Sequence, residues 1–192
     1  MPTQAQRTES TRAALVAAGR RLFGRDGFAA TSIEDLTAEA GVTRGALYHH
    51  FETKEALFEA VFESVEVELL ARAAKASSGG KDPWARLKVG CRAFLQSASD
   101  PEVQRIISVD APSVLGWEKW RSIEERYGLG AIRASLQAAA ADGYLPRRDI
   151  ETLAHILFGA LIEATMVLAS RSRPAKRVHA EFDALLEALR TR

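Results

Sequence analysis

The chain has 192 residues, of which 47% are hydrophobic and 27% are charged, with 26 lysines and arginines against 25 aspartates and glutamates. This composition is typical of a globular protein with enough apolar residues for one or two cores, and it argues against a disordered chain. A net charge of +1 neither requires nor excludes a nucleic-acid partner, so the placement of the charges has to decide.

Helical signals recur along the whole chain, and strand signals are nearly absent. Apolar residues return every three or four positions, and Ser, Thr, Asp, Gly and Pro stand where segments begin and end. These patterns predict an all-α protein of about nine helices. In chain order they cover 8–24, 31–41, 43–51 and 53–76, then helices that begin at Pro83 and Pro101, then 117–142, 150–170 and 174–190.

The second and third predicted helices, joined by "AEAGVT", have the pattern of a helix-turn-helix. Thr31 is predicted to cap the second helix, with Glu34 three residues later completing a capping box. Gly41 takes the turn position, where a side chain would clash. The predicted buried set of this motif is Ile33, Leu36, Ala40, Val42, Leu47 and Phe51.

The third predicted helix has a polar face. Arg44 can offer two donors to guanine, and Gly45 allows close approach of the backbone. Tyr48 and His49 can bond phosphate oxygens or touch thymine methyl groups. Helix N-termini attract phosphates as well, through free N–H groups and the helix dipole. The predicted DNA-binding residues are therefore Thr31, Ser32, Thr43, Arg44, Gly45, Tyr48, His49 and Lys54.

The segment "GFAATSIEDLTAEAGVTRGALYHHFETKEALF", most specifically "LYHHF" followed by Lys54, resembles the tetracycline-repressor (TetR) family of regulators over about residues 8–62. The resemblance implies an all-α homodimer with a DNA-binding domain over 1–52 and a ligand-binding and dimerisation domain over 53–192, whose first helix connects the two. It also implies operator contacts at Thr43, Arg44, Gly45, Tyr48, His49 and Lys54. Glu52 departs from the small residue or proline common in the family, and its charge would weaken binding to phosphates.

The predicted helix 150–170 is apolar nearly all round, so more than one of its sides must be covered. With the last helix, 174–190, it fits the four-helix bundle by which TetR-like proteins form homodimers; the alternative is a monomeric core helix. Its apolar run, 153–169, is shorter than the roughly 20 residues that span a bilayer. With the lone Cys91 and no apparent leader segment, this favours a cytoplasmic protein without a membrane partner.

A ligand site is expected in the second half of the chain, in segments that resemble the cavity-lining helices of the family. Aromatic residues and a methionine would supply apolar walls, and two carboxylates are candidates for a polar contact. The alternative is that each aromatic residue belongs to the core. The predicted ligand-binding residues are Trp84, Phe94, Asp110, Trp117, Trp120, Tyr127, Glu163 and Met166.

The leading hypothesis is a DNA-binding transcriptional regulator, a repressor that leaves a palindromic operator when a small ligand fills its C-terminal cavity. One alternative is a ligand-binding or scaffold dimer without DNA binding. Another is an all-α metal-dependent enzyme, for which Glu151 and His155 lie one helical turn apart, with Glu163 further along. No glycine-rich phosphate loop, paired cysteines or Ser-His-Asp arrangement supports an enzyme, so catalytic residues, metal and cofactor are not expected.

Overall fold

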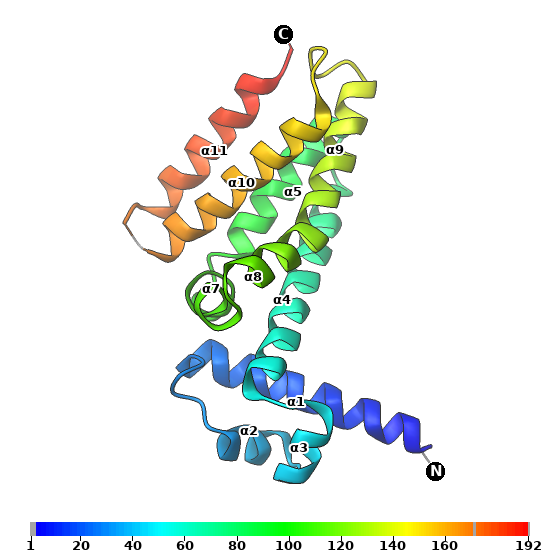
Figure 1. Ribbon diagram of the computed structural model, residues 1–192. Helices are drawn as coiled ribbons and strands as arrows, with labels where there is room; N and C mark the ends of the chain where they lie inside the picture. The colour runs from blue at the N-terminus through cyan, green and yellow to red at the C-terminus, as the bar shows by residue number, and fades with distance from the viewer. Residues whose placement is uncertain (1–2, 171, 192) are drawn as a thin grey trace. The chain divides into compact units, whose positions relative to one another are not determined.

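The computed structural model describes residues 3–170 and 172–191. α6, η1 and α7 follow one another without a break, as do α8, η2 and α9, so the described part of the chain forms nine continuous helical segments (Figure 1). The prediction of an all-α fold with about nine helices is confirmed. The elements are α1 (Gln4–Asp26), α2 (Ile33–Ala40), α3 (Arg44–His50), α4 (Lys54–Ser77), α5 (Pro83–Ser97), α6 (Pro101–Gln104), π-helix η1 (Arg105–Asp110), α7 (Ala111–Leu115), α8 (Trp117–Glu124), π-helix η2 (Glu125–Leu129), α9 (Gly130–Ala141), α10 (Ile150–Ala169) and α11 (Ala175–Leu189).

The chain packs into two compact units. The first, called unit 1 below, comprises Met1–Val65 and Pro101–Trp120, and the second, unit 2, comprises Glu66–Asp100 and Arg121–Arg192. Helix α4 contributes to both units. The predicted DNA-binding domain, 1–52, and ligand-binding and dimerisation domain, 53–192, are defined by function and not by packing. Their boundary stays a prediction.

Unit 1 is built around α1, which packs against α2, α3 and the α6–η1 segment. The rings of Phe23, Phe28 and Phe58 form a cluster with centroids 5.3–5.7 Å apart. Helix α1 begins earlier than predicted, because Thr3 caps it in a capping box with Gln6. This core fixes the loop that leads into α2.

The start of α2 differs from the prediction by one residue. Ser32 is the N-cap, and it forms a capping box with Asp35 rather than the predicted pair of Thr31 and Glu34. Thr31 instead donates its hydroxyl to the carbonyl oxygen of Gly27 at 2.8 Å and is buried. A threonine and a serine side by side give the same sequence signal, and the burial of Thr31 decides between them.

Unit 2 packs α5 against α9, and α10 against α9, α5 and α11. Asp82 caps α5 with Pro83 in its first turn, and Asp149 caps α10. Helix α10 has 20 residues with a mean hydropathy of 1.8 over its most apolar window, half of which is buried. By length and composition it could cross a membrane, so the expectation that it is too short is wrong; its buried residues are those of a core helix of unit 2.

Candidate functional site

Helix α3 is a short helix held by one buried side. Thr43 caps it, with its Oγ1 accepting from the backbone N–H of Ala46 at 3.2 Å. Leu47 is completely buried and Phe51 is almost completely buried, and together they anchor α3 to the rest of unit 1. Gly41, which ends α2, has a φ of 65° in the left-handed region, so a side chain there would strain the turn. The predicted burial of Leu36, Leu47 and Phe51 is confirmed, whereas Ile33, Ala40 and Val42 are half-buried.

The opposite side of α3 is exposed and polar. Thr43, Arg44, Gly45 and His49 are exposed, and Tyr48 keeps 41% of its surface accessible. The structure thus brings five of the predicted DNA-binding residues together on one surface, called the α3 face below. Side chains on this surface can meet a partner without disturbing the core.

Arg44 already has local partners on the α3 face. Its Nη1 lies 2.8 Å from Oε1 of Glu34 on α2, and its guanidinium lies 5.5 Å from the centre of the Tyr48 ring. Both members of the ion pair are more than 60% exposed, so water weakens it strongly. Arg44 can exchange this pair for an external acceptor at small cost.

Lys54 is engaged inside the protein. It is half-buried, and its ammonium donates to the carbonyl oxygens of Phe28 at 2.9 Å and Thr31 at 3.0 Å. The same nitrogen lies 4.1 Å from the centre of the Phe28 ring. Lys54 therefore ties the loop before α2 to the start of α4, and its contact with DNA at this helix N-terminus stays a prediction.

Two further predicted DNA-binding residues lie at the start of α2. Thr31 is buried beneath the surface, so its side chain has no access to a phosphate. Ser32 is half-buried, and its hydroxyl donates to Asp35 Oδ2 at 2.6 Å. Ser32 also lowers the pKa of the Asp35 carboxyl by this hydrogen bond. The negative charge of Asp35 therefore occupies the N-terminus that was expected to attract a phosphate.

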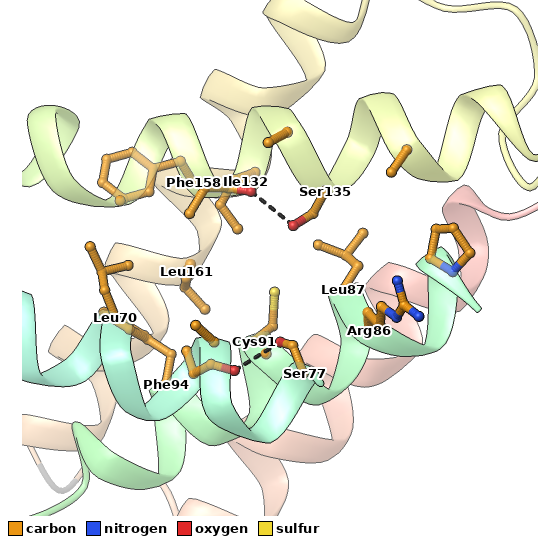
Figure 2. Close-up of a pocket in the computed structure, with 18 of the residues that line it drawn as sticks. Leu70, Ser77, Arg86, Leu87, Cys91, Phe94, Ile132, Ser135, Phe158 and Leu161 are labelled. Atoms are coloured by element: carbon orange, nitrogen blue, oxygen red, sulfur yellow. Dashed lines mark hydrogen bonds between the residues drawn. The ribbon is translucent and has the colours of Figure 1, made fainter. Parts of the chain in front are cut away.

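Unit 2 contains a cavity of about 760 Å³ between α4, α5, the η2–α9 segment and α10. Figure 2 shows Leu70 and Phe94 towards one end of it and Arg86 towards the other, with Cys91 and Ser77 between them. Most of the wall is carbon. The lining residues are Glu66, Leu70, Ala73, Ala74, Ser77, Ser78, Pro83, Arg86, Leu87, Gly90, Cys91, Phe94, Gly128, Ala131, Ile132, Ala134, Ser135, Ala138, Phe158 and Leu161.

Glu66 is the unusual polar residue of this wall. Its exposed fraction is 1%, and its Oε1 finds no hydrogen-bond partner among the residues that the structure describes. Burial raises the pKa of its carboxyl to about 7. Burial, with the nearby charge of Asp183, also raises the pKa of the Cys91 thiol to about 12, so this thiol stays protonated at neutral pH.

The predicted ligand-binding residues fall mostly outside the cavity. Phe94 lines it, and the other seven do not. Asp110 accepts the backbone N–H of Phe28 at 2.8 Å within unit 1, and Trp117 is 65% exposed. Of the remaining five, Trp84 and Trp120 are buried in the cores, Tyr127 and Met166 are half-buried, and Glu163 is exposed.

The sequence interpretation missed Glu66, although a signal was present. Glu66 lies four residues after the buried Phe62 and four before Leu70, which is the spacing of one helical face. It is one of three glutamates in "ESVEVELL", and the sequence pattern alone does not separate it from the half-buried Glu63 and Glu68.

Glu151 and His155, the residues considered for a metal site, are not joined by a third metal-binding side chain among the described residues. The Nε2 of His155 lies 3.7 Å from Oε1 of Glu151, and that carboxylate also pairs with Arg133 at 2.6 Å. Within residues 3–170 and 172–191 no group of three or more histidines, cysteines or acidic residues is placed to hold a metal ion.

Comparisons with known proteins agree with this architecture. Residues 15–61 match the family described as "Bacterial regulatory proteins, tetR family", and residues 84–189 match "Tetracyclin repressor-like, C-terminal domain". The Transposon Tn10 TetC protein of Escherichia coli is 26% identical over 156 residues, which cover 81% of this chain and 79% of that protein. The HTH-type transcriptional regulator TtgR of Pseudomonas putida is 35% identical over 104 residues, or 53% of this chain and 49% of TtgR.

A solved structure extends the similarity to the whole chain. The crystal structure of a TetR-family transcriptional regulator from Pectobacterium atrosepticum is 34% identical, with a TM-score of 0.86 over 100% of this chain and 99% of that one. The chain belongs to the TetR family of DNA-binding transcriptional regulators.

Proposed function

We propose that this regulator is a repressor that binds a palindromic operator as a homodimer in the bacterial cytoplasm and leaves it when a small molecule fills the cavity of unit 2. The observation that carries the DNA-binding part is the α3 face, where exposed polar residues stand on a helix anchored by the buried Leu47. A helix presented in this way fits the major groove. Arg44, Tyr48 and His49 would read or position the DNA, with Thr43 and Gly45 close to its backbone.

Selection from a randomised duplex pool at two salt concentrations tests this function. Retained sequences that share an inverted repeat, and that persist at the higher salt, are the expected result, because phosphate contacts alone weaken steeply with salt. Half-sites about 34–36 Å apart, or a multiple of that, would fit a two-fold dimer. Retention without a shared sequence would count against a sequence-specific repressor.

Arg44→Ala is expected to relax sequence preference at one base pair by roughly 1–3 kcal/mol, because it removes a two-donor contact to a base edge. Arg72→Ala is the matched control, since Arg72 is an exposed arginine of unit 2 that pairs with Glu68 on α4. Titration of the selected operator and its single-base variants measures the effect. Equal weakening on every sequence would identify Arg44 as a phosphate contact instead.

Glu34→Gln is expected to strengthen operator binding by about twofold to fivefold, because it frees Arg44 from an exposed ion pair worth roughly 1 kcal/mol at most. The change also removes a negative charge beside the α3 face. Titration against the selected operator measures it, with Glu39→Gln as a control that breaks the neighbouring Arg21 pair instead. Unchanged or weaker binding would mean that the Glu34 pair holds Arg44 in its binding position.

Helices α10 and α11 support the proposed homodimer. Ile156 on α10 is 64% exposed and Leu185 on α11 is 44% exposed, although both are large apolar side chains. Burial of such residues against a second copy removes apolar area from water. Light scattering during size-exclusion chromatography gives the mass, and we expect Ile156→Glu combined with Leu185→Glu to shift it from dimer to monomer.

The proposed release is a coupling between two sites, and coupling is reciprocal. Helix α4 supplies Glu66 and Leu70 to the cavity and Lys54 to the anchor of the loop before α2. A ligand that prefers one arrangement of this helix shifts the population of DNA-competent dimers. Operator DNA must then weaken ligand binding by the same factor, so equal ligand affinity with and without operator would rule out this mechanism.

A further inference from the structure

We infer that the effector of this cavity is an elongated apolar amine whose cationic nitrogen lies against the Glu66 carboxylate at the buried end. This inference rests on the proposed function of the cavity as the effector site. It goes beyond it by naming the chemical class of the ligand and the residue that selects it.

The cavity has two different ends. Arg86, in the first turn of α5, is exposed, whereas Phe94, eight residues later and about 12 Å along that helix, is buried. Figure 2 shows Leu70 at the same end of the cavity as Phe94, with Arg86 at the other end. Glu66 lies one turn before Leu70 on α4 and about 16 Å along that helix from Ser77, so it belongs to the buried end.

The wall between the two ends is apolar and can contact the hydrocarbon part of a ligand. Leu70, Leu87, Ile132, Phe158 and Leu161 line it, and a series of alanines from α4 and α9 leaves the space open. A cavity of about 760 Å³ with such walls suits a molecule whose body is a chain or a set of fused apolar rings.

The other polar side chains of the wall have partners. The hydroxyls of Ser77 and Ser135 donate to the carbonyl oxygens of Ala73 and Ala131, each at 2.8 Å. Arg86 donates its Nε to the carbonyl oxygen of Gly80 at 3.2 Å. Of the buried oxygen and nitrogen atoms on side chains lining the cavity, Glu66 Oε1 is the one without a partner in the described chain.

The charge of Glu66 favours a cation over a neutral or anionic group. A buried carboxylate without a counter-ion is costly, so a ligand cation is stabilised there more than a hydroxyl is, and a second carboxylate is repelled. Two cationic side chains close to the cavity wall are engaged elsewhere. Arg86 lies at the exposed end, and Arg121, which lies 5.2 Å from the centre of the Phe158 ring, pairs with Glu125 at 3.0 Å.

Calorimetric titration with three probes of equal chain length tests the inference on the full-length protein at pH 7.5: decylamine, 1-decanol and decanoate. Decylamine is a cation at this pH, because alkyl amines titrate near pH 10. We expect decylamine to bind at least about tenfold more tightly than 1-decanol, as for other charge-assisted hydrogen bonds, and decanoate to bind most weakly. Equal or tighter binding of 1-decanol or decanoate by the wild-type protein would overturn the inference without any variant.

Three variants assign the preference to Glu66. Glu66→Gln keeps the shape of the side chain and is expected to abolish the tenfold preference while 1-decanol binding stays within about twofold. Glu68→Gln changes a carboxylate two residues away that pairs with Arg72, and Ser135→Ala changes another polar group of the wall; both should keep the preference. Circular dichroism checks that each variant is folded. A preference that survives in folded Glu66→Gln contradicts the role of Glu66.

A parallel titration with the selected operator separates this inference from the proposed function. Glu66-dependent binding of decylamine that leaves operator affinity unchanged supports the amine site and contradicts ligand-induced release. Release of operator by 1-decanol or decanoate, but not by decylamine, supports release and contradicts the amine site. Operator binding with no detectable binding of decylamine up to its solubility limit also contradicts the amine site.

Discussion

The stability of the Glu66→Gln variant, compared with that of the wild type, is expected to increase as the pH rises from 4.5 to 8. Burial raises the pKa of the Glu66 carboxyl from its ordinary value of 4.5 to about 7 in the folded chain. Below pH 4.5 the folded and unfolded chains both carry this proton. Between pH 4.5 and 7 the unfolded chain loses the proton first, so the free energy of unfolding of the wild type falls. Above pH 7 both chains have lost the proton, and the total decrease in the free energy of unfolding is about 3 kcal/mol.

Glutamine has no proton to lose in this range, so the free energy of unfolding of the Glu66→Gln variant does not show this decrease. Urea unfolding of both proteins at several pH values between 4.5 and 8 gives the difference in their free energies of unfolding, which cancels the contributions of titrating groups that the substitution leaves unchanged. Glu68→Gln on the outer side of α4 gives the baseline for loss of a glutamate from this helix. A difference that stays constant across the range would mean that water reaches the Glu66 carboxylate in solution.

Lys54→Met is expected to lower the free energy of unfolding by about 2 kcal/mol, as measured by urea unfolding, because hydrogen bonds from a charged group are worth roughly 1.5–3 kcal/mol. Methionine keeps an unbranched apolar chain near Phe28, but it leaves the carbonyl oxygens of Phe28 and Thr31 without their ammonium donor. Loosening of this loop should also weaken operator binding, because the loop leads directly into α2.

Lys75→Met is the matched control, since Lys75 is exposed in the last turn of the same helix. Unfolding and operator titration of the two variants at several salt concentrations distinguish two roles for Lys54. A structural role lowers stability and leaves the dependence of affinity on salt unchanged. Unchanged stability with a salt slope reduced by about one would identify a phosphate contact and contradict the role described for the loop.

The helices and their order were predictable because each signal is local. The Asp82–Pro83 start of α5 and the Gly41 turn after α2 depend on neighbours within one helical turn. The α3 face was predictable for the same reason, since Leu47 and Phe51 fix which side is buried. The choice between Thr31 and Ser32 as cap failed because burial of Thr31 depends on the three-dimensional packing of unit 1.

The cavity was not predictable in the same way. The prediction of ligand-binding residues relied on large aromatic side chains, but Trp84 and Trp120 are buried and do not line the cavity. The space is instead lined largely by small residues such as Ala73, Gly90 and Ala131, which leave volume unfilled. Small residues give no chemical signal in a sequence, and the role of Glu66 depends on which helices face it.

The three tryptophans also give the molecule a built-in optical probe. Trp84 is the tryptophan of unit 2, whereas the exposed Trp117 and the buried Trp120, with ring centres 5.0 Å apart, belong to unit 1. Replacing the latter pair with phenylalanine leaves one tryptophan, buried in α5 beside the cavity-lining Pro83, which can be excited selectively at wavelengths that tyrosine does not absorb. Its emission then reports events in unit 2 by intensity and colour, without a dye, while operator DNA is present.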